Sequence, residues 1–150
     1  MPANPIYKFH AELMNTDLKV WREFEVVNNY PMSKLGYIVM ALFRMQGNHL
    51  WTFEVPYKEN EKPKIDIDSI ENVFERNAAI YATEVYRVEI PNPYNEFAEE
   101  VKCLDATKTK ISKIITEVGE NMVFNYDFGD NWEIKLTLKE IYIDNKLHGR

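Results

Sequence analysis

Residues 123–133 read Val-Phe-Asn-Tyr-Asp-Phe-Gly-Asp-Asn-Trp-Glu, and this stretch decides how the last part of the chain folds. Apolar and polar residues alternate on both sides of a central Asp-Phe-Gly-Asp-Asn segment, whose residue types favour turns. Within that segment, Gly129 is free to adopt a positive φ angle. The pattern predicts a β-hairpin with its loop at residues 127–131.

The alternation also predicts which side chains of the hairpin face the core. Apolar residues share one face of each strand, and they are Met122, Phe124, Tyr126 and Phe128 on the first strand and Trp132, Ile134, Leu136 and Leu138 on the second. Ile141 and Ile143 continue this apolar series with one extra residue inserted. We therefore expect a β-bulge near Lys139 or Glu140.

Length, composition and charge restrict the possible classes of protein. The chain has 150 residues, of which 45% are hydrophobic, and this is enough core material for one globular domain over residues 1–150. The formal net charge of -6 argues against a broad nucleic-acid-binding or membrane-binding surface, which normally requires basic residues. A local basic patch for nucleic acid is possible but is not favoured by this charge.

The single cysteine and the first residues of the chain predict the cellular compartment. Cys103 has no second cysteine with which to form a disulfide, which fits a reducing compartment. Residues 1–5 lack the basic start and apolar run of a signal peptide, and no apolar stretch is long enough to span a bilayer. We expect a cytoplasmic protein without a membrane partner.

The first third of the chain predicts a strand-strand-helix-strand unit. Two amphipathic strands are expected at residues 6–13 and 20–27, joined by a turn at residues 15–17. Apolar residues then recur at helical spacing after Pro31, with Ser33 as the expected cap and Gly47 just past the helix end. A short strand should follow at residues 50–55. This order of elements is typical of a ubiquitin-like roll.

The middle of the chain predicts further elements of the same α+β fold. Capping-box spacing at residues 68–71 predicts a short helix that ends near Phe74, and residues 83–90 alternate like a strand. Asp105 or Thr107 is expected to cap a second clear helix, whose apolar stripe consists of Ile111, Ile114, Ile115 and Val118. The sheet should be mixed or mostly antiparallel.

Several segments together carry a resemblance to a known family. They are Val20-Trp21-Arg22, the helix with Leu35, residues 48–53 (Asn-His-Leu-Trp-Thr-Phe), Leu104-Asp105 and residues 124–132. In this order they resemble the plasmid pRiA4b ORF-3-like family, whose members are also known as passenger or TnpR-like proteins of insertion elements. The resemblance implies an α+β domain, an association with plasmids or mobile elements, and no established enzymatic activity.

The chain departs from the family pattern in three places. Ile134 stands where many relatives have histidine, and residues 43–47 read Phe-Arg-Met-Gln-Gly where many relatives have Phe-Gly-Trp. Longer relatives also continue into a tail containing cysteine and glycine, whereas this sequence stops at Arg150. The resemblance therefore does not imply any ligand that relatives bind through that histidine or tail.

Three carboxylates fall in or beside the hairpin loop. Asp127, Asp130 and Glu133 could converge and bind Mg²⁺ or Ca²⁺, which prefer oxygen ligands. The alternative is that Asp127 and Asp130 accept hydrogen bonds from backbone N–H groups of the turn, which is the usual reason for aspartate there. We favour the turn role, and we expect neither a metal nor another cofactor.

His49 precedes an apolar strand and is a candidate general base or metal ligand. The sequence offers it no second ligand at a suitable spacing, so a structural role is favoured. Cys103 could act with His49 as a nucleophile. A small buried hydrophobic residue is the preferred interpretation of Cys103.

The tryptophans define a candidate binding surface. Trp21, Trp51 and Trp132 could stack bases or a peptide, with Arg22 supplying positive charge. The alternative is core packing, because tryptophan is mostly buried in small domains. We favour core packing for Trp51 and Trp132, and the two alternatives are balanced for Trp21.

The leading functional hypothesis is a non-enzymatic binding or accessory protein of plasmids or mobile elements that acts through a protein partner, including as an inhibitor that mimics DNA charge. The alternative is a small-ligand or metal-dependent enzyme that uses His49, Asp127 and Asp130, with Arg22, around a pocket. That alternative requires these side chains to converge in one cavity. A nucleic-acid-binding module is the third hypothesis.

Overall fold

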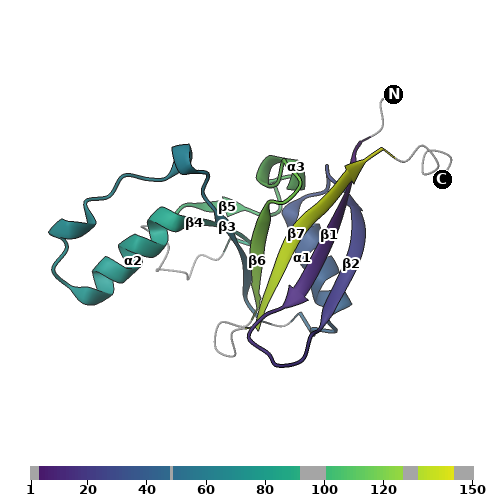
Figure 1. Cartoon of the computed structure of the whole chain (residues 1–150), viewed down its shortest axis with the longest axis horizontal. Helices are drawn as coiled ribbons and strands as arrows, with labels where there is room; N and C mark the ends of the chain where they lie inside the picture. Colours follow the sequence, from purple (N-terminus) through teal and green to yellow (C-terminus); the bar gives the residue numbers. More distant parts are fainter. Residues whose placement is uncertain (1–3, 48, 92–100, 127–131, 144–150) are drawn as a thin grey trace.

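The computed structural model describes residues 4–47, 49–91, 101–126 and 132–143. Its strands form one seven-stranded sheet in the order β2-β1-β7-β6-β3-β4-β5 (Figure 1). The strand bounds are β1 Ile6–Leu13, β2 Trp21–Val27, β3 Trp51–Pro56, β4 Val85–Glu89, β5 Cys103–Asp105, β6 Asn121–Tyr126 and β7 Trp132–Tyr142. All neighbouring strands are antiparallel except β4 and β5, which are parallel. The predicted α+β fold with a mixed sheet is confirmed.

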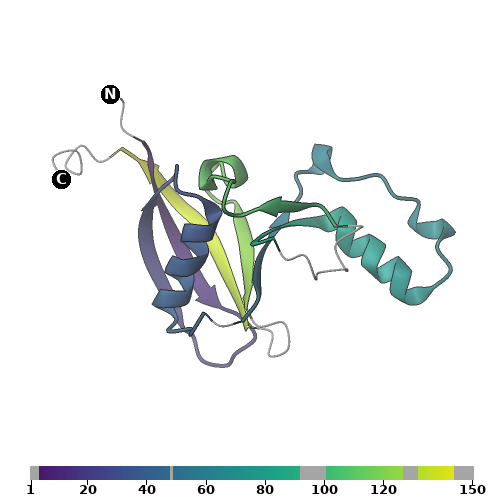
Figure 2. The same cartoon turned by 180° about the vertical axis from the view of Figure 1, so that it is seen from behind.

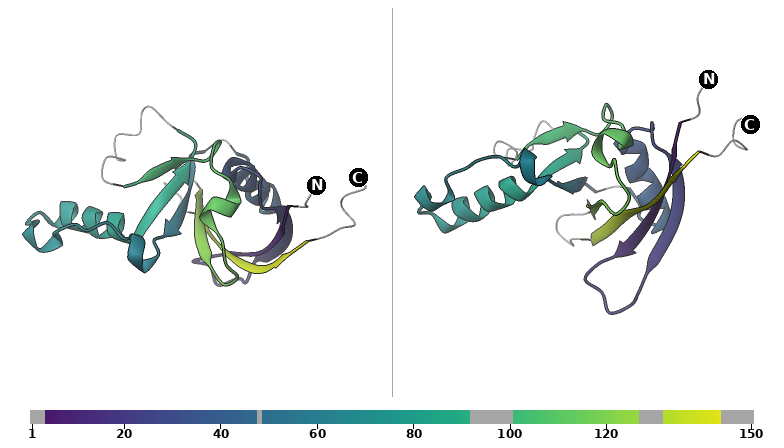
Figure 3. Two further views of the ribbon diagram at one scale, coloured as in Figure 1. Left: turned by 90° about the horizontal axis from the view of Figure 1, so that it is seen from above. Right: turned by 45° about the horizontal axis from the view of Figure 1, so that its top comes forward.

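Helix α1 covers one face of the strands β2, β1 and β7 (Figure 2), and the sheet curves around it (Figure 3). The helices are α1 Met32–Leu42, α2 Val73–Glu84 and α3 Ile111–Ile114, and the 3-10 turns are η1 Glu59–Glu61 and η2 Ile67–Ser69. The predicted order of strand, strand, helix and strand at the start of the chain is confirmed by β1, β2, α1 and β3. None of the helices in the described ranges is long and apolar enough to cross a membrane.

The C-terminal hairpin lies in the middle of the sheet and supplies much of its core. Its strands β6 and β7 pair as predicted, and the side chains of Phe124, Ile134 and Leu138 are fully buried beneath α1. Opposite β1, Lys8 pairs with Glu140 whereas Phe9 pairs with Leu138, so that Lys139 is the extra residue. The predicted bulge is therefore confirmed, and it keeps Leu138 in the core. The loop at residues 127–131 lies outside the described residues.

The predicted caps of α1 are wrong at both ends. Pro31 is the N-cap residue and makes no side-chain capping bond, while Ser33 lies within the helix. The first N–H groups bond backbone carbonyls instead, because Met32 donates to Thr109 at 2.8 Å and Ser33 donates to Ala106 at 2.9 Å. At the other end, Arg44, rather than Gly47, takes the left-handed conformation that closes the helix, with φ of 57°.

Helix α2 was not predicted, because the expected short helix at residues 68–74 is in the wrong place. The residues with capping-box spacing lie in and just after η2, and α2 begins at Val73. Its cap is Asn72, whose side chain accepts from the N–H groups of Phe74 and Glu75 at 2.9 and 3.1 Å. In α2 only Ala79 and Ala82 are buried, so it carries no apolar stripe that periodicity could detect. The helix extends away from the main sheet (Figure 1).

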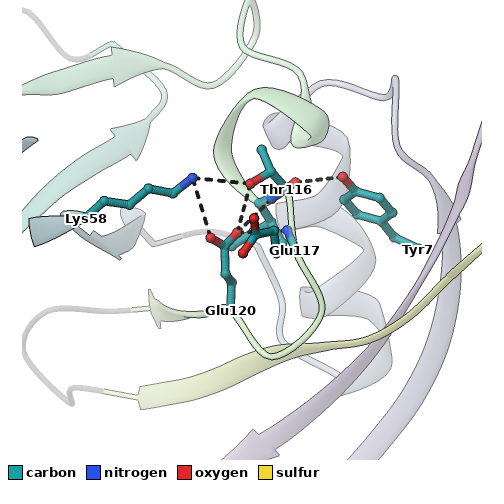
Figure 4. A network of polar contacts seen from close by, with 6 residues as sticks. Tyr7, Lys58, Thr116, Glu117 and Glu120 are labelled. Carbon is teal, nitrogen blue, oxygen red and sulfur yellow. Dashed lines mark hydrogen bonds and ion pairs between the residues drawn. The ribbon is translucent and has the colours of Figure 1, made fainter. Parts of the chain in front are cut away.

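The second predicted helix is much shorter than expected. It spans only Ile111–Ile114, and Asp105 does not cap it but closes a turn by accepting from the Thr107 N–H at 2.9 Å. The helix ends because Glu120 Oε1 accepts from the N–H groups of Thr116 and Glu117, at 2.7 and 3.1 Å (Figure 4). The stripe is correct for Ile111, Ile114 and Ile115, which are buried, but Val118 is exposed.

Candidate ligand-binding pocket

One end of the sheet carries a pocket of about 520 Å³. The last residues of β1 and β6 and the first residues of β2 and β7 meet there, because these strands are antiparallel neighbours or lie close in the sheet. The segment that follows α1 completes the wall. Apolar side chains make up about half of the lining, and they are Leu13, Val20, Leu42, Phe43, Met45 and Trp132. The polar lining residues are Arg22, Arg44, Gln46, His49 and Tyr126.

Arg22 is held in a defined orientation at this pocket. Its Nη1 donates to the backbone carbonyl of Trp21 at 2.8 Å, and its guanidinium carbon lies 5.7 Å from the centre of the Phe43 ring. A guanidinium has five N–H donors, so these contacts leave donors for a further acceptor. No carboxylate pairs with Arg22 within the described part of the chain.

Arg44 occupies a backbone position that normally suits glycine. The Arg44 N–H donates to Ala41 at 3.2 Å and the Met45 N–H donates to Met40 at 2.8 Å, which is the Schellman pattern at a helix end. The φ of 57° at Arg44 is uncommon for a residue with a Cβ atom. Its guanidinium lines the pocket and has no hydrogen-bond or ion-pair partner among residues 4–47, 49–91, 101–126 and 132–143.

Tyr126 ties the segment after α1 to the sheet. Its hydroxyl accepts a hydrogen bond from the Gly47 N–H at 3.0 Å, and Gly47 has a φ of 77°. The His49 ring meets the Tyr126 ring edge-on, with centroids 5.6 Å apart. These contacts position the loop that carries Arg44 against β6.

The structure brings together three of the residues that the sequence identified as binding candidates. Arg22, His49 and Trp132 all line this pocket, and the Trp132 side chain is 46% exposed. The expectation that Trp132 packs in the core is therefore wrong. It stands at the first position of β7, beyond the fully buried Ile134, where the pocket leaves its side chain open.

The predicted surface of three tryptophans does not form. Trp21 is 45% exposed and stacks on His10 at 5.3 Å, on the face opposite to Arg22, because successive strand residues alternate. Trp51 is 8% exposed and packs in the core, as favoured above. The three indoles therefore do not form one surface: Trp21 stacks on His10, Trp51 packs in the core, and Trp132 lines the pocket.

The predicted carboxylate site is largely untested. Asp127 and Asp130 lie outside the described residues, and Glu133 pairs with Asn125 along the sheet rather than lining the pocket. The described residues contain no group of three histidine, cysteine or acidic side chains that could hold a metal ion. Cys103 is exposed at the sheet edge, where burial was expected, and it does not line the pocket with His49.

Arg44 and Tyr126 belong to the pocket although the sequence gave no reason to choose them as binding residues. Tyr126 was predicted only as a core residue of the hairpin. Arg44 reads as an ordinary surface residue after a helix, because nothing in the sequence shows that its backbone turns to the left-handed region. Two positive side chains thus meet in one pocket of a chain with a net charge of -6.

A smaller hollow of about 270 Å³ lies between β3, β4 and the segment around α3. Its lining includes Lys58 and Glu120, whose Nζ and Oε2 atoms are 3.6 Å apart (Figure 4). Tyr86 lies in the same wall, and its pKa is raised to about 12. Burial is the largest cause, and the negative charge of the nearby Glu61 is the next largest. Lys58 and Glu120 therefore form an ion pair in this hollow, whereas the described lining residues of the larger pocket include no carboxylate.

Comparisons with known proteins identify a family and a solved structure of similar fold. A model of the family described as plasmid pRiA4b ORF-3-like protein matches residues 5–148. The crystal structure of a protein of unknown function from Methanosarcina mazei Go1 superposes with a TM-score of 0.66 at 18% identity, and it shares the fold. The match covers 97% of this chain and 65% of that protein, so this chain spans less than two thirds of its length. None of the curated proteins matches the chain.

Proposed function

This chain belongs to the plasmid pRiA4b ORF-3-like family, and from its pocket we propose that it is a binding protein for a small organic molecule. One observation carries the proposal. Arg22, His49 and Trp132, which stand on separate segments of the sequence, converge on a single pocket of about 520 Å³. Of the four side chains that the small-ligand hypothesis brings into one cavity, Arg22 and His49 line this pocket, and Asp127 and Asp130 lie outside the described residues.

The composition of the lining supports the same proposal. Ligand pockets are typically about 300–1,000 Å³ in volume and are lined by apolar and aromatic side chains with a few polar groups. Leu13, Val20 and Trp132 offer apolar surface, while Arg22 and Arg44 offer directed hydrogen-bond donors. A ligand held in this way is in contact with β1, β2, β7 and the end of α1 at once.

The proposal is tested by NMR titration of the wild-type protein with a library of small metabolites. Binding to the folded state must also raise the melting temperature. We expect at least one compound to shift the indole N–H of Trp132 and the side-chain signals of Arg22 and Arg44 while it stabilises the protein. If every compound leaves these signals unchanged, or if all shifts map to other surfaces, the proposal is wrong.

A protein partner is the second candidate function, and an exposed apolar pair on α2 favours it. Val73 and Phe74 begin this projecting helix, and they are 63% and 86% exposed. Large exposed apolar side chains in one place often mark a protein-binding site. We propose that this chain acts as an accessory protein of plasmids or mobile elements and binds a protein partner here, in keeping with the name of the family.

The test of this second candidate uses Phe74→Ser and an exposed control, Val118→Ser, because Val118 is 57% exposed on a different part of the surface. A partner recovered with the wild type and with Val118→Ser should be lost with Phe74→Ser. A partner retained equally by all three proteins would place its binding surface away from α2.

A further inference from the structure

We infer that the ligand of this pocket is an organic anion, whose carboxylate or phosphate group is bound by Arg22 and Arg44 and whose apolar part lies against Trp132. This inference rests on the proposed function and names the class of ligand. Three observations carry it: the two arginines among the described lining residues, the contacts that orient Arg22, and the backbone conformation of Arg44.

Among the described residues, the lining carries positive charge without a matching carboxylate. Of the described residues that line the pocket, two are arginines and none is aspartate or glutamate. Two guanidinium groups that line the same pocket carry the same charge and repel each other. An anion that binds between them removes this repulsion, whereas a neutral or cationic ligand does not.

The orientation of Arg22 is suited to an oxyanion. Its contact with the Trp21 carbonyl at 2.8 Å and its position over the Phe43 ring favour one orientation of the guanidinium plane. A planar guanidinium presents pairs of N–H groups that match the two oxygens of a carboxylate or phosphate. Because the side chain is already ordered, binding loses little of its conformational entropy.

The fold alone does not account for Arg44. The Schellman turn at the end of α1 is formed by backbone groups, and its left-handed position favours glycine. An arginine there strains the backbone, and its only gain for the helix end over glycine is a cation near the helix C-terminus. This residue also contributes a second arginine to the pocket, whose lining includes Trp132, and that side chain is 46% exposed.

Probes with one ring and different charges test the class of ligand. We would titrate benzoate, phenyl phosphate, benzamide and benzylamine into the wild type and follow the Arg22, Arg44 and Trp132 signals by NMR. Either anion, or both, should bind more tightly than the neutral amide and the amine by about tenfold, which is the size of a charge-assisted hydrogen bond. The affinities of the two anions decide between a carboxylate and a phosphate ligand.

Three substitutions with the same charge change complete the experiment. Arg22→Gln and Arg44→Gln should each weaken binding of the preferred anion by about tenfold, because each removes charged donors. Lys64→Gln is the control, since Lys64 is exposed in the segment between η1 and η2 and does not line the pocket. It should leave the affinity unchanged.

Three results would overturn the inference, and each leaves the proposed function open to its own test. The first is that benzamide or benzylamine binds as tightly as the anions. The second is that none of the four probes binds, and the third is that anion binding survives both arginine substitutions. If the metabolite library nevertheless yields a neutral ligand of this pocket, only the anion inference fails. If the library also yields none, the proposed function fails with it.

Discussion

The indole of Trp51 lies directly against the backbone of Gly36 in α1. A Cβ atom added at Gly36 would stand 2.7 Å from Cη2 of Trp51 and 2.9 Å from Cζ3, which is closer than such contacts allow. Phe53 and Phe124 pack on other sides of this indole, with ring centroids 5.7 and 5.5 Å away. Gly36 is therefore the residue that lets α1 approach the sheet closely.

Gly36→Ala should destabilise the protein although alanine is the better helix former. Overpacking of a well-packed site typically costs about 1–3 kcal/mol, while the helix propensity gain is about 1 kcal/mol. We expect a net loss of up to about 2 kcal/mol in the free energy of unfolding, measured by urea denaturation. In the background of Trp51→Phe, which removes the clashing ring atoms, the same substitution should cost less. An equal cost in both backgrounds would contradict the proposed clash.

Arg44→Gly should separate the stability of the fold from the function of the pocket. Relief of the left-handed strain gains about 1–2 kcal/mol, while loss of a cation near the helix C-terminus costs about 0.3–1 kcal/mol. Since glycine also makes the unfolded chain more flexible, the net change in unfolding free energy should lie within about 1 kcal/mol of zero. Thermal or urea denaturation measures it, alongside anion affinity, which should fall. A loss well above 2 kcal/mol, on the scale of core defects, would instead give Arg44 a structural role.

The parts of the fold that were predicted from sequence are those determined by local patterns. Alternation over β6 and β7 is sufficient to place Phe124 and Ile134 in the core, and the shift in that pattern after Leu138 revealed the bulge at Lys139. Helix α2 escaped prediction because its surface is mostly exposed, so its sequence lacks the apolar stripe on which periodicity depends.

The pocket could be predicted only in part, for a different physical reason. Arg22 and Trp132 were chosen for their chemistry, but they become neighbours through the pairing of β1 with β2 and with β7, which no local pattern encodes. The exposed face of Trp132 likewise depends on where the strands end. No pattern in the sequence indicated that Arg44 lines the pocket, because a left-handed φ angle at arginine contradicts the local preference of the residue.

Tyr126→Phe should loosen the loop that carries Arg44. The substitution removes the acceptor of the Gly47 N–H, a hydrogen bond of 3.0 Å, and leaves the ring in place. A partly buried bond of this kind is worth about 0.5–1.5 kcal/mol. Amide hydrogen exchange at Gly47 should become faster, and the free energy of unfolding should fall by a similar amount.

Tyr37→Phe is the matched control for this substitution. Tyr37 is 56% exposed, and no hydrogen bond of its hydroxyl is found in the described part of the structure. It should therefore leave both stability and exchange at Gly47 unchanged. If both substitutions lower stability and speed exchange at Gly47 equally, these effects come from the loss of any tyrosine hydroxyl and not from the hydrogen bond of Tyr126.

The carboxylate of Glu120 should make stability depend on pH in the acid range. Burial taken alone raises its pKa, but the N–H groups of Thr116 and Glu117 and the Lys58 ammonium together outweigh burial and hold the pKa below its usual value (Figure 4). A carboxyl group with a lowered pKa stabilises the fold fully above its unfolded pKa of about 4.3. This stabilisation is lost as the pH falls through the folded pKa.

Glu120→Gln is expected to remove this dependence, because the amide oxygen can still accept the backbone N–H bonds but carries no charge. Urea denaturation from pH 7 to pH 3 should show the wild type more stable than the variant above about pH 4.3, with the difference shrinking at lower pH. Lys58→Gln should reduce the same difference in part, since Lys58 Nζ lies 3.6 Å from the carboxylate. A difference that stays constant down to pH 3 would show that the carboxylate contributes through its hydrogen-bond geometry alone, and not through its charge.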